Sequence, residues 1–289
     1  MAGSYRIEHR LTDKVSLSKR ISAGLEVWAG SAHTSRFFEF YRKLLDIQSE
    51  IEEKAGAPGL KIDRDEISAC LTAGKKILAY TDLKLDRTLL NAAFHRVACL
   101  FSEYPEILGP VPETLTAASF SPPPAWGEAW FNGEDFSPEP GGEAQPLLVP
   151  TLIQQALRPF LIGYAQALKG SFDQKKWGRS DCPVCGAKPE MAFLEKEGGA
   201  RWCLCSACTT EWLFKRMQCP YCDNTEATTL SFLGSEDGLY RLYLCEECKA
   251  YLKAVDLRKT TREVDLPLES LTTVAMDSQA QEKGYHRGA

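Results

Sequence analysis

Four Cys-x-x-Cys units lie in one segment of the sequence: "CPVC" at 182–185, "CSAC" at 205–208, "CPYC" at 219–222 and "CEEC" at 245–248. They contain eight of the eleven cysteines in the chain. A Cys-x-x-Cys turn, here called a knuckle, places two sulfur atoms on one side of a tight loop, and two knuckles supply the four thiolates of a tetrahedral zinc or iron site. The pattern therefore predicts two consecutive metal sites whose ligands are Cys182, Cys185, Cys205, Cys208, Cys219, Cys222, Cys245 and Cys248.

The spacing pairs the knuckles in sequence order. The first pair reads C-x2-C-x19-C-x2-C and the second reads C-x2-C-x22-C-x2-C, and both loops suit a hairpin between two knuckles. A ribbon of about 40 residues buries too little apolar surface to fold alone, so a bound metal must supply the missing folding free energy. Because cysteine occupies every corner, neither site keeps an open position for a substrate, which argues against metal-dependent hydrolysis.

Other uses of these cysteines stay open. Pairing the two middle knuckles, 205–208 with 219–222, would leave the outer two without partners. A disulfide of the thioredoxin type requires a βαβ context that this segment lacks. Cys203 lies two residues before Cys205. We interpret it as a strand cysteine near the site that does not bind the metal, and the alternative is an exchangeable ligand or a redox-active thiol.

The spacing does not decide between iron and zinc. "CPVCG" and "CPYC" are similar to rubredoxin knuckles, in which a glycine after the second cysteine lets the backbone turn under the metal. Gly186 occupies that position in the first ribbon, but Asp223 replaces it in the second, so the similarity is weaker there. Zinc ribbons use the same geometry.

The chain before the cysteine segment is predicted to be helical. The stretch 34–53 has apolar residues with a 3.6-residue period. Asp63, followed by Glu66, resembles a capping box, and Asp86 caps a second amphipathic stretch. Pro159 should kink or split a later helix. The predicted inward faces consist of Phe37, Tyr41, Leu44, Gln48 and Ile51 in the first stretch and Leu90, Phe94, Val97 and Phe101 in the second.

Residues 105–146 are rich in Pro, Gly and acidic residues but also contain five aromatic residues. A disordered linker is usually poor in aromatics, so we expect an ordered segment with short helical turns lying on the helical domain; the alternative is a mobile loop that meets a partner. After the cysteines, 250–265 is predicted to be a strand and an exit from it, followed by one helix of roughly 14 residues with Leu268, Leu271 and Ala275 facing inward.

The predicted fold class is α+β. An all-α N-terminal domain precedes two small rubredoxin-like or zinc-ribbon-like metal modules and a C-terminal helix. The predicted boundaries are 1–175 for the helical domain, 176–216 for the first four-cysteine module, 217–258 for the second, and 259–289 for the C-terminal helix and tail.

The composition is that of an ordinary globular protein, with 44% hydrophobic and 25% charged residues. No stretch approaches the roughly 20 apolar residues of a membrane span, and the N-terminal sequence lacks the apolar core of a secretory signal. We therefore expect a cytoplasmic protein. Because that compartment disfavours disulfides, paired cysteines there are more often metal ligands. Cys70 and Cys99 lie in helical patterns and are interpreted as buried small apolar residues.

Nothing in the sequence indicates an enzyme. The four histidines, His9, His33, His95 and His286, have no nearby nucleophile or ligand-spaced partner. No phosphate loop, dinucleotide-binding glycine pattern or nucleophile motif is visible. We therefore expect no catalytic residues, and we interpret His95 as a structural histidine.

Three stretches of this sequence resemble a known family. The run "RWCLCSACTTEWLFKRMQCPYC" at 201–222, "LYLCEECKAYLKAVD" at 242–256 and "AMDSQAQEKGYHRG" at 275–288 resemble the formate dehydrogenase accessory protein family, FdhE. The resemblance implies an α-helical N-terminal domain followed by two rubredoxin-like modules. It also implies iron bound by the eight cysteines, and a role as a maturation factor that contacts the catalytic subunit of respiratory formate dehydrogenase in the cytoplasm. The tail ends sooner after "GYHRG" than in the family pattern.

Two other functions compete with this one. A rubredoxin-like protein would transfer electrons to the dehydrogenase. A zinc ribbon that binds nucleic acid would use strand aromatics for stacking, but residues 170–260 contain 13 basic and 13 acidic residues, and metal-bound thiolates add negative charge. For the partner surface, the candidates are "TEWLFKR" at 210–216 and "KAYLK" at 249–253. The alternative for the first is a Glu–Arg surface pair, Glu211 with Arg216, beside a Trp212 that covers the metal.

Overall fold

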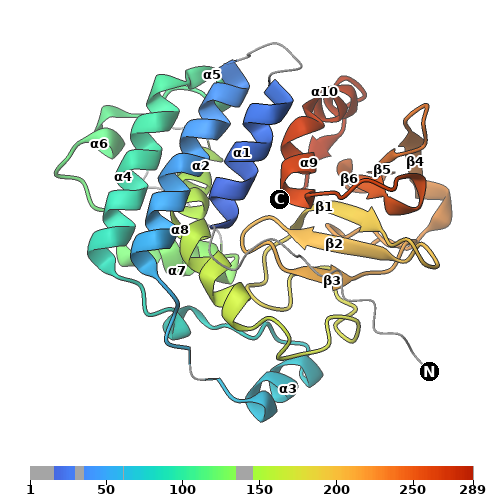
Figure 1. Cartoon of the computed structure of the whole chain (residues 1–289), viewed down its shortest axis with the longest axis horizontal. Coiled ribbons are helices and arrows are strands. Elements are labelled where there is room, and N and C mark those ends of the chain that lie inside the picture. Colours follow the sequence, from blue (N-terminus) through green and yellow to red (C-terminus); the bar gives the residue numbers. More distant parts are fainter. Residues whose placement is uncertain (1–15, 30–35, 61, 135–145, 289) are drawn as a thin grey trace.

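Helices occupy the first part of the chain and a sheet occupies the second, with two C-terminal helices between them (Figure 1). The computed structural model describes residues 16–29, 36–60, 62–134 and 146–288. The longer helices of the first part are α1 (Leu17–Ala29), α2 (Arg36–Ala55), α3 (Arg64–Thr72), α4 (Arg87–Glu103) and α8 (Leu148–Ala167). The shorter ones are η1 (Tyr80–Asp82), α5 (Pro105–Leu108), α6 (Glu113–Thr116) and α7 (Pro124–Asn132).

The predicted caps are present. The carboxylate of Asp63 accepts the backbone N–H groups of Asp65 and Glu66, each at 2.8 Å, and the Glu66 side chain accepts the N–H of Asp63 in return. Asp86 accepts the N–H of Thr88 at 2.8 Å and so caps α4. These bonds satisfy backbone donors that a helix start would otherwise leave open, which confirms both helix starts.

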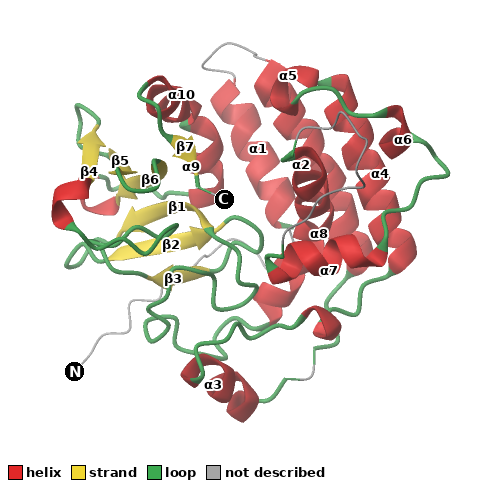
Figure 2. Ribbon diagram, turned by 180° about the vertical axis from the view of Figure 1, so that it is seen from behind, coloured by secondary structure: helices red, strands yellow, loops and turns green. Residues whose placement is uncertain are grey.

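The helical core lies between α2, α4 and α8, which run side by side in Figures 1 and 2. The α4 stripe of Leu90, Phe94, Val97 and Phe101 is buried as predicted, and Phe40 of α2 packs edge-on against Phe101 at a centroid distance of 4.8 Å. Pro159 does not split the helix, because α8 continues through it as one helix. Pro159 removes a backbone donor, but its neighbours are buried on nearly all sides, and this packing holds the helix together.

The described part of the segment 105–146 is ordered and lies on the helical domain, as predicted. Phe120 packs between Phe94 of α4 and Trp126 of α7, with both ring centroids 5.9 Å away. Phe131 is 4% exposed within the same core. Phe136, which the prediction also included, lies outside the described residues.

Both ribbons contribute strands to one sheet, whose order is β3-β2-β1-β6-β5-β4. Strand β1 of the first ribbon pairs in parallel with β6 of the second, from Ala192 opposite Ala254 to Leu194 opposite Asp256. A boundary between residues 216 and 217 stays a prediction, but the strands on either side of it belong to a continuous sheet. Their bounds are β1 (Pro189–Leu194), β2 (Arg201–Cys205), β3 (Glu211–Leu213), β4 (Leu230–Gly234), β5 (Tyr240–Cys245) and β6 (Ala250–Asp256).

The C-terminal segment forms two short helices, α9 (Leu266–Thr272) and α10 (Val274–Glu282), where one helix was predicted. The helix is interrupted at Thr273, in a run of β-branched residues, and the Thr273 hydroxyl donates to Glu269 O at 2.7 Å. The break also changes the helix face, so Ala275 is exposed and Ala280 is buried instead.

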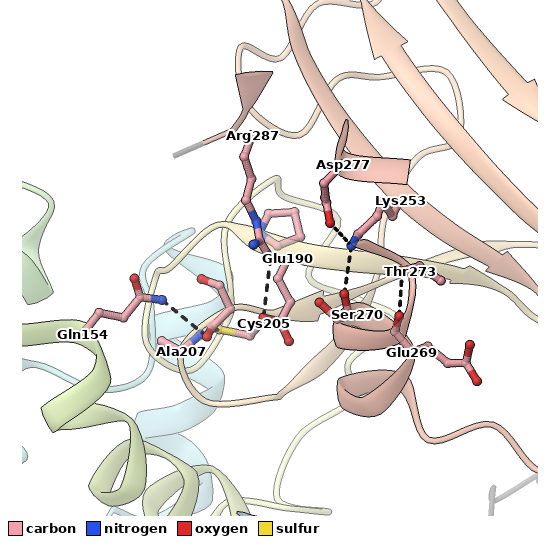
Figure 3. Close-up of polar contacts among 12 residues, drawn as sticks. Gln154, Glu190, Cys205, Ala207, Lys253, Glu269, Ser270, Thr273, Asp277 and Arg287 are labelled. Carbon is pink, nitrogen blue, oxygen red and sulfur yellow. Dashed lines mark hydrogen bonds and ion pairs between the residues drawn. The ribbon is translucent and has the colours of Figure 1, made fainter. Parts of the chain in front are cut away.

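Polar side chains fasten these helices to the sheet (Figure 3). Lys253 of β6 is 1% exposed and donates to Asp277 at 2.6 Å and to Ser270 O at 2.8 Å. Arg287 lies at 4.0 Å from Glu190 of β1. Its strand, β7 (His286–Arg287), pairs in parallel with β6. In the described part of the chain, no helix combines the length and apolar character needed to cross a membrane.

Candidate metal centres

The four cysteines predicted for each site converge in the structure. Within each group, the sulfur atoms all lie within 4.8 Å of one another. In the first site, Cys182, Cys185, Cys205 and Cys208, three of the sulfur–sulfur distances are 3.4, 3.5 and 3.6 Å. In the second site, Cys219, Cys222, Cys245 and Cys248, two of these distances are 3.7 Å.

These distances fit a tetrahedral metal ion. Four sulfurs at about 2.3 Å from a central ion lie about 3.8 Å from one another. A disulfide needs about 2.05 Å, and every cysteine in the chain is free. The pairing of knuckles in sequence order is also the one observed, and the alternative pairing of 205–208 with 219–222 does not occur. Each group can therefore hold one metal ion.

All four knuckles use the same backbone turn. The residue after the second cysteine has a positive φ in each case: 82° at Gly186, and 56 to 59° at Thr209, Asp223 and Lys249. In the described part of the chain, the last three are the non-glycine residues with a positive φ. Such a conformation costs roughly 1–2 kcal/mol for an L-residue. Asp223 therefore takes the glycine conformation, and the second ribbon is as close to a rubredoxin-type knuckle as the first.

The turns direct backbone N–H groups at the sulfurs. Val184 N lies 3.4 Å from Cys182 Sγ, Ala207 N lies 3.4 Å from Cys205 Sγ, and Tyr221 N lies 3.5 Å from Cys219 Sγ. Such contacts favour the thiolate, which is the form that binds metal.

Burial acts in the opposite direction on the thiols. It raises the pKa of Cys182 well above the usual value for a thiol. In the second site burial also opposes ionisation of Cys245, yet the backbone N–H of Cys248 and the amide of Asn224 lower its pKa to about 7. A metal cation would offset the repulsion between four close thiolates, so metal binding releases protons and weakens in acid.

The first site lies against the helical domain. Its four cysteines are at most 3% exposed and belong to the same apolar core as α2, α4 and α8. Ile77 and Leu78, in the loop after α3, donate backbone hydrogen bonds to Pro183 O at 2.8 Å and Val184 O at 3.0 Å. On the other side of the site, Arg158 of α8 donates to Ser206 O within the second knuckle.

The second site is more open, because Cys222 is exposed and Cys248 is half-buried. The C-terminal tail covers one of its knuckles. The Tyr285 hydroxyl donates to the Glu246 carboxylate, and His286 Nε2 lies 2.9 Å from Cys248 O. The sequence did not predict these tail contacts. The segment "GYHRG" is part of the family resemblance, but the sequence indicates no partner for His286.

The difference in exposure predicts the order of metal loss. A chelator should remove the ion of the second site first, because it can approach through Cys222, whereas the first site is enclosed by the apolar core. Metal release measured with a coloured chelator should show two phases. Helical circular dichroism should stay unchanged during the first phase. A single phase, or a loss of helix with the first equivalent, would contradict this order.

Cys203 lies outside both groups. It is fully buried in β2, opposite Ala192 and Trp212 on the neighbouring strands. Burial raises its pKa to about 12, so it is a poor ligand and a poor redox thiol. This placement supports the reading of Cys203 as a strand cysteine that does not bind the metal.

The two segments suggested as a partner surface are only partly exposed: Lys215, Arg216 and Lys249 are exposed, whereas most of their apolar residues are buried. Trp212 is fully buried and donates its indole N–H to Arg179 O at 2.9 Å, while Phe214 is 2% exposed. In the second segment, residues 250–253 are the first four residues of β6 and all are buried. Alternation along a strand does not reveal burial on both faces, and here the C-terminal helices cover the face that would have been open.

Burial of Glu211 in β3 gives a pH-dependent prediction, because it raises the pKa of this carboxyl group to about 7 from 4.5. The folded chain then binds a proton more tightly than the unfolded chain, so this group favours folding below about pH 4.5 and opposes it as the pH rises through 7. E211Q should raise the free energy of unfolding by about 3 kcal/mol at pH 8 and by less than about 1 kcal/mol at pH 5.

Denaturant unfolding of the metal-loaded protein at the two pH values measures this effect. The exposed Glu197, replaced in E197Q, is the matched control and should change stability at neither pH. Equal effects of E211Q at pH 5 and pH 8 would refute the prediction.

Comparisons with known proteins agree on one family. The family model described as "FdhE, central domain" matches residues 181–216, which contain the first site. The "Protein FdhE homolog" of Aquifex aeolicus (strain VF5) is 39% identical over 139 residues, covering 45% of this chain and 49% of that protein. The "Protein FdhE homolog" of Shewanella baltica (strain OS185) is 24% identical over 253 residues, covering 86% of this chain and 79% of that protein.

The match to the Aquifex relative spans about half of its length. The crystal structure of the FdhE protein from Pseudomonas aeruginosa has the same fold, with a TM-score of 0.59 at 21% identity and coverage of 94% of this chain and 93% of that one. This likeness confirms the predicted combination of a helical part with a sheet region. In this chain the sheet region contains the two four-cysteine groups. From the motifs, the sequence relatives and the fold together, the chain is similar to the FdhE family.

Proposed function

We propose that this protein is an accessory protein for the formation of active respiratory formate dehydrogenase, and that it binds the catalytic subunit of that enzyme in the cytoplasm. The observation that supports this proposal is similarity to the FdhE family, together with two cysteine groups whose geometry fits metal ions. In this proposal the protein matures its partner and catalyses no reaction itself.

We further propose that the eight cysteines hold two iron ions, with zinc as the alternative. A bound ion would supply folding free energy and, in the case of iron, one-electron chemistry. The chain's own contribution is the shape of the site: the knuckles direct N–H groups at the sulfurs, and all four corners are protein ligands. Closed sites of this kind are typical of structural and electron-transfer metals.

Anaerobic purification of the tagged protein from its native cells tests the proposal. We expect about two metal ions per chain by elemental analysis and the formate dehydrogenase catalytic subunit among the co-purified proteins. A parallel preparation from cells that lack the catalytic subunit is the control. A metal-free protein would refute the metal scaffold. Full formate dehydrogenase activity in cells that lack this protein would refute the accessory role.

Electron transfer to the dehydrogenase is a second candidate, and the exposure of Cys222 favours it. An electron donor needs a short path from the metal to the surface, and an exposed ligand provides one. Zinc has no redox chemistry in proteins. If protein carrying only zinc supports full maturation of the dehydrogenase, electron transfer is excluded and the accessory role stands.

A further inference from the structure

Arg201 is a buried cation that connects the two ribbons. It belongs to β2 of the first ribbon and is 2% exposed. Its Nη2 donates to Gln218 O at 2.6 Å and to Lys215 O. Gln218 directly precedes Cys219, so a side chain of the first ribbon holds the entry to the first knuckle of the second site.

No carboxylate in the described part of the chain forms an ion pair with Arg201. Its guanidinium lies over the rings of Phe214 and Tyr243, at 5.3 and 5.2 Å from the centroids, and its Nε has no hydrogen-bond partner. Burial of a charge is costly unless an opposite charge compensates it, and two carbonyls and two ring faces provide only part of that compensation. Further negative charge must therefore lie nearby.

The second site provides this negative charge. Arg201 lines a small pocket, open to solvent, together with Cys219 and Cys245. Four thiolates around a divalent ion carry a net charge of about −2. We propose that Arg201 is the cationic partner of the second metal centre and stabilises its negative charge. This inference rests on the metal binding proposed above.

The charge of Arg201 has two measurable consequences. It slows loss of the metal from the second site, because an empty site would leave the cation unpaired. With iron bound, it favours the ferrous form, because a ferrous site has one more negative charge than a ferric site. In the titration, a chemical reductant supplies the electron that converts ferric to ferrous iron.

Three variants test the proposal. R201M removes the charge but keeps a long apolar stem, whereas R201K keeps the charge and loses the planar group. Arg216 is exposed and lines the same pocket, so R216M is a control with the same change in net charge. Iron-loaded protein is titrated with redox mediators, and metal release is followed with a coloured chelator. Helical circular dichroism and retention of the first ion report folding.

We expect R201M to weaken the preference of one site for ferrous iron about tenfold, which lowers one reduction potential by about 59 mV and leaves the other unchanged. Release of one ion should accelerate about tenfold. R201K and R216M should resemble the wild type in both measurements. An unchanged potential in folded R201M overturns the proposal.

A folded R201K with the lowered potential also overturns it, because the hydrogen bonds to the carbonyls would then matter and the charge would not. If R201M does not fold, R201K decides alone: a wild-type potential supports the proposal and a lowered potential refutes it. If the wild type binds two ions and folded R201M releases both at the wild-type rate, only this inference is refuted. A wild-type protein that binds neither iron nor zinc refutes the metal scaffold as well.

Discussion

Replacing Cys182 and Cys185 together by serine should unfold most of the protein, including the helical domain. The first site shares its apolar core with α2, α4 and α8, and the loop after α3 donates hydrogen bonds to its first knuckle. A structural four-cysteine site contributes about 10–16 kcal/mol of apparent binding free energy at neutral pH, which exceeds the roughly 5–15 kcal/mol stability of a typical domain. Helical circular dichroism and the yield of monodisperse protein measure the loss.

The matched control is Cys203, which is buried in the same core but lies outside the tetrad. C203A removes one sulfur and should cost about 1 kcal/mol, with both metal ions retained. If the double serine variant keeps its helices and a cooperative melting transition, the first site is not needed for the helical fold.

Replacing Cys219 and Cys222 by alanine should have a more local effect on structure and an equally large effect on function. The protein should lose one metal ion of two, and β4 and β5 should lose their order, because the apolar cluster beside them is small and the metal supplies part of the folding free energy. The helices and the first ion should remain. Since the proposed scaffold would be broken, formate dehydrogenase activity in cells should be abolished.

Elemental analysis, helical circular dichroism and an assay of formate dehydrogenase in a complemented deletion strain measure the three effects. C70A, which changes a half-buried cysteine of α3 far from the metal sites in sequence, is the control and should be fully active. Normal activity in the Cys219/Cys222 variant would show that the second site is not required for maturation.

The two double variants separate the roles of two sites that look alike in sequence. Both have two knuckles with nearly the same spacing, and all four knuckles share the positive-φ turn. Their surroundings differ, since the first site is sealed by helices and the second is covered in part by the C-terminal tail. We therefore expect the first site to stabilise the fold. We expect the second site to be the one that solvent or a partner can reach.

The sequence by itself determined the features that depend on neighbouring residues. The caps at Asp63 and Asp86 form because their side chains reach N–H groups two and three residues away. The eight sulfurs were found from spacing because a knuckle is a local turn, and two knuckles at hairpin distance bring their four sulfurs together. The amphipathic stripe of α4 was read correctly for the same reason.

Only the tertiary structure decided how these pieces combine. The parallel pairing of β1 with β6, the continuity of α8 through Pro159 and the break at Thr273 all depend on packing. So do the burial of Trp212 and the contacts of Arg201 with the entry to Cys219. Burial and long-range hydrogen bonds join residues that are far apart in the chain. Local sequence patterns do not predict which distant surface will cover a given residue.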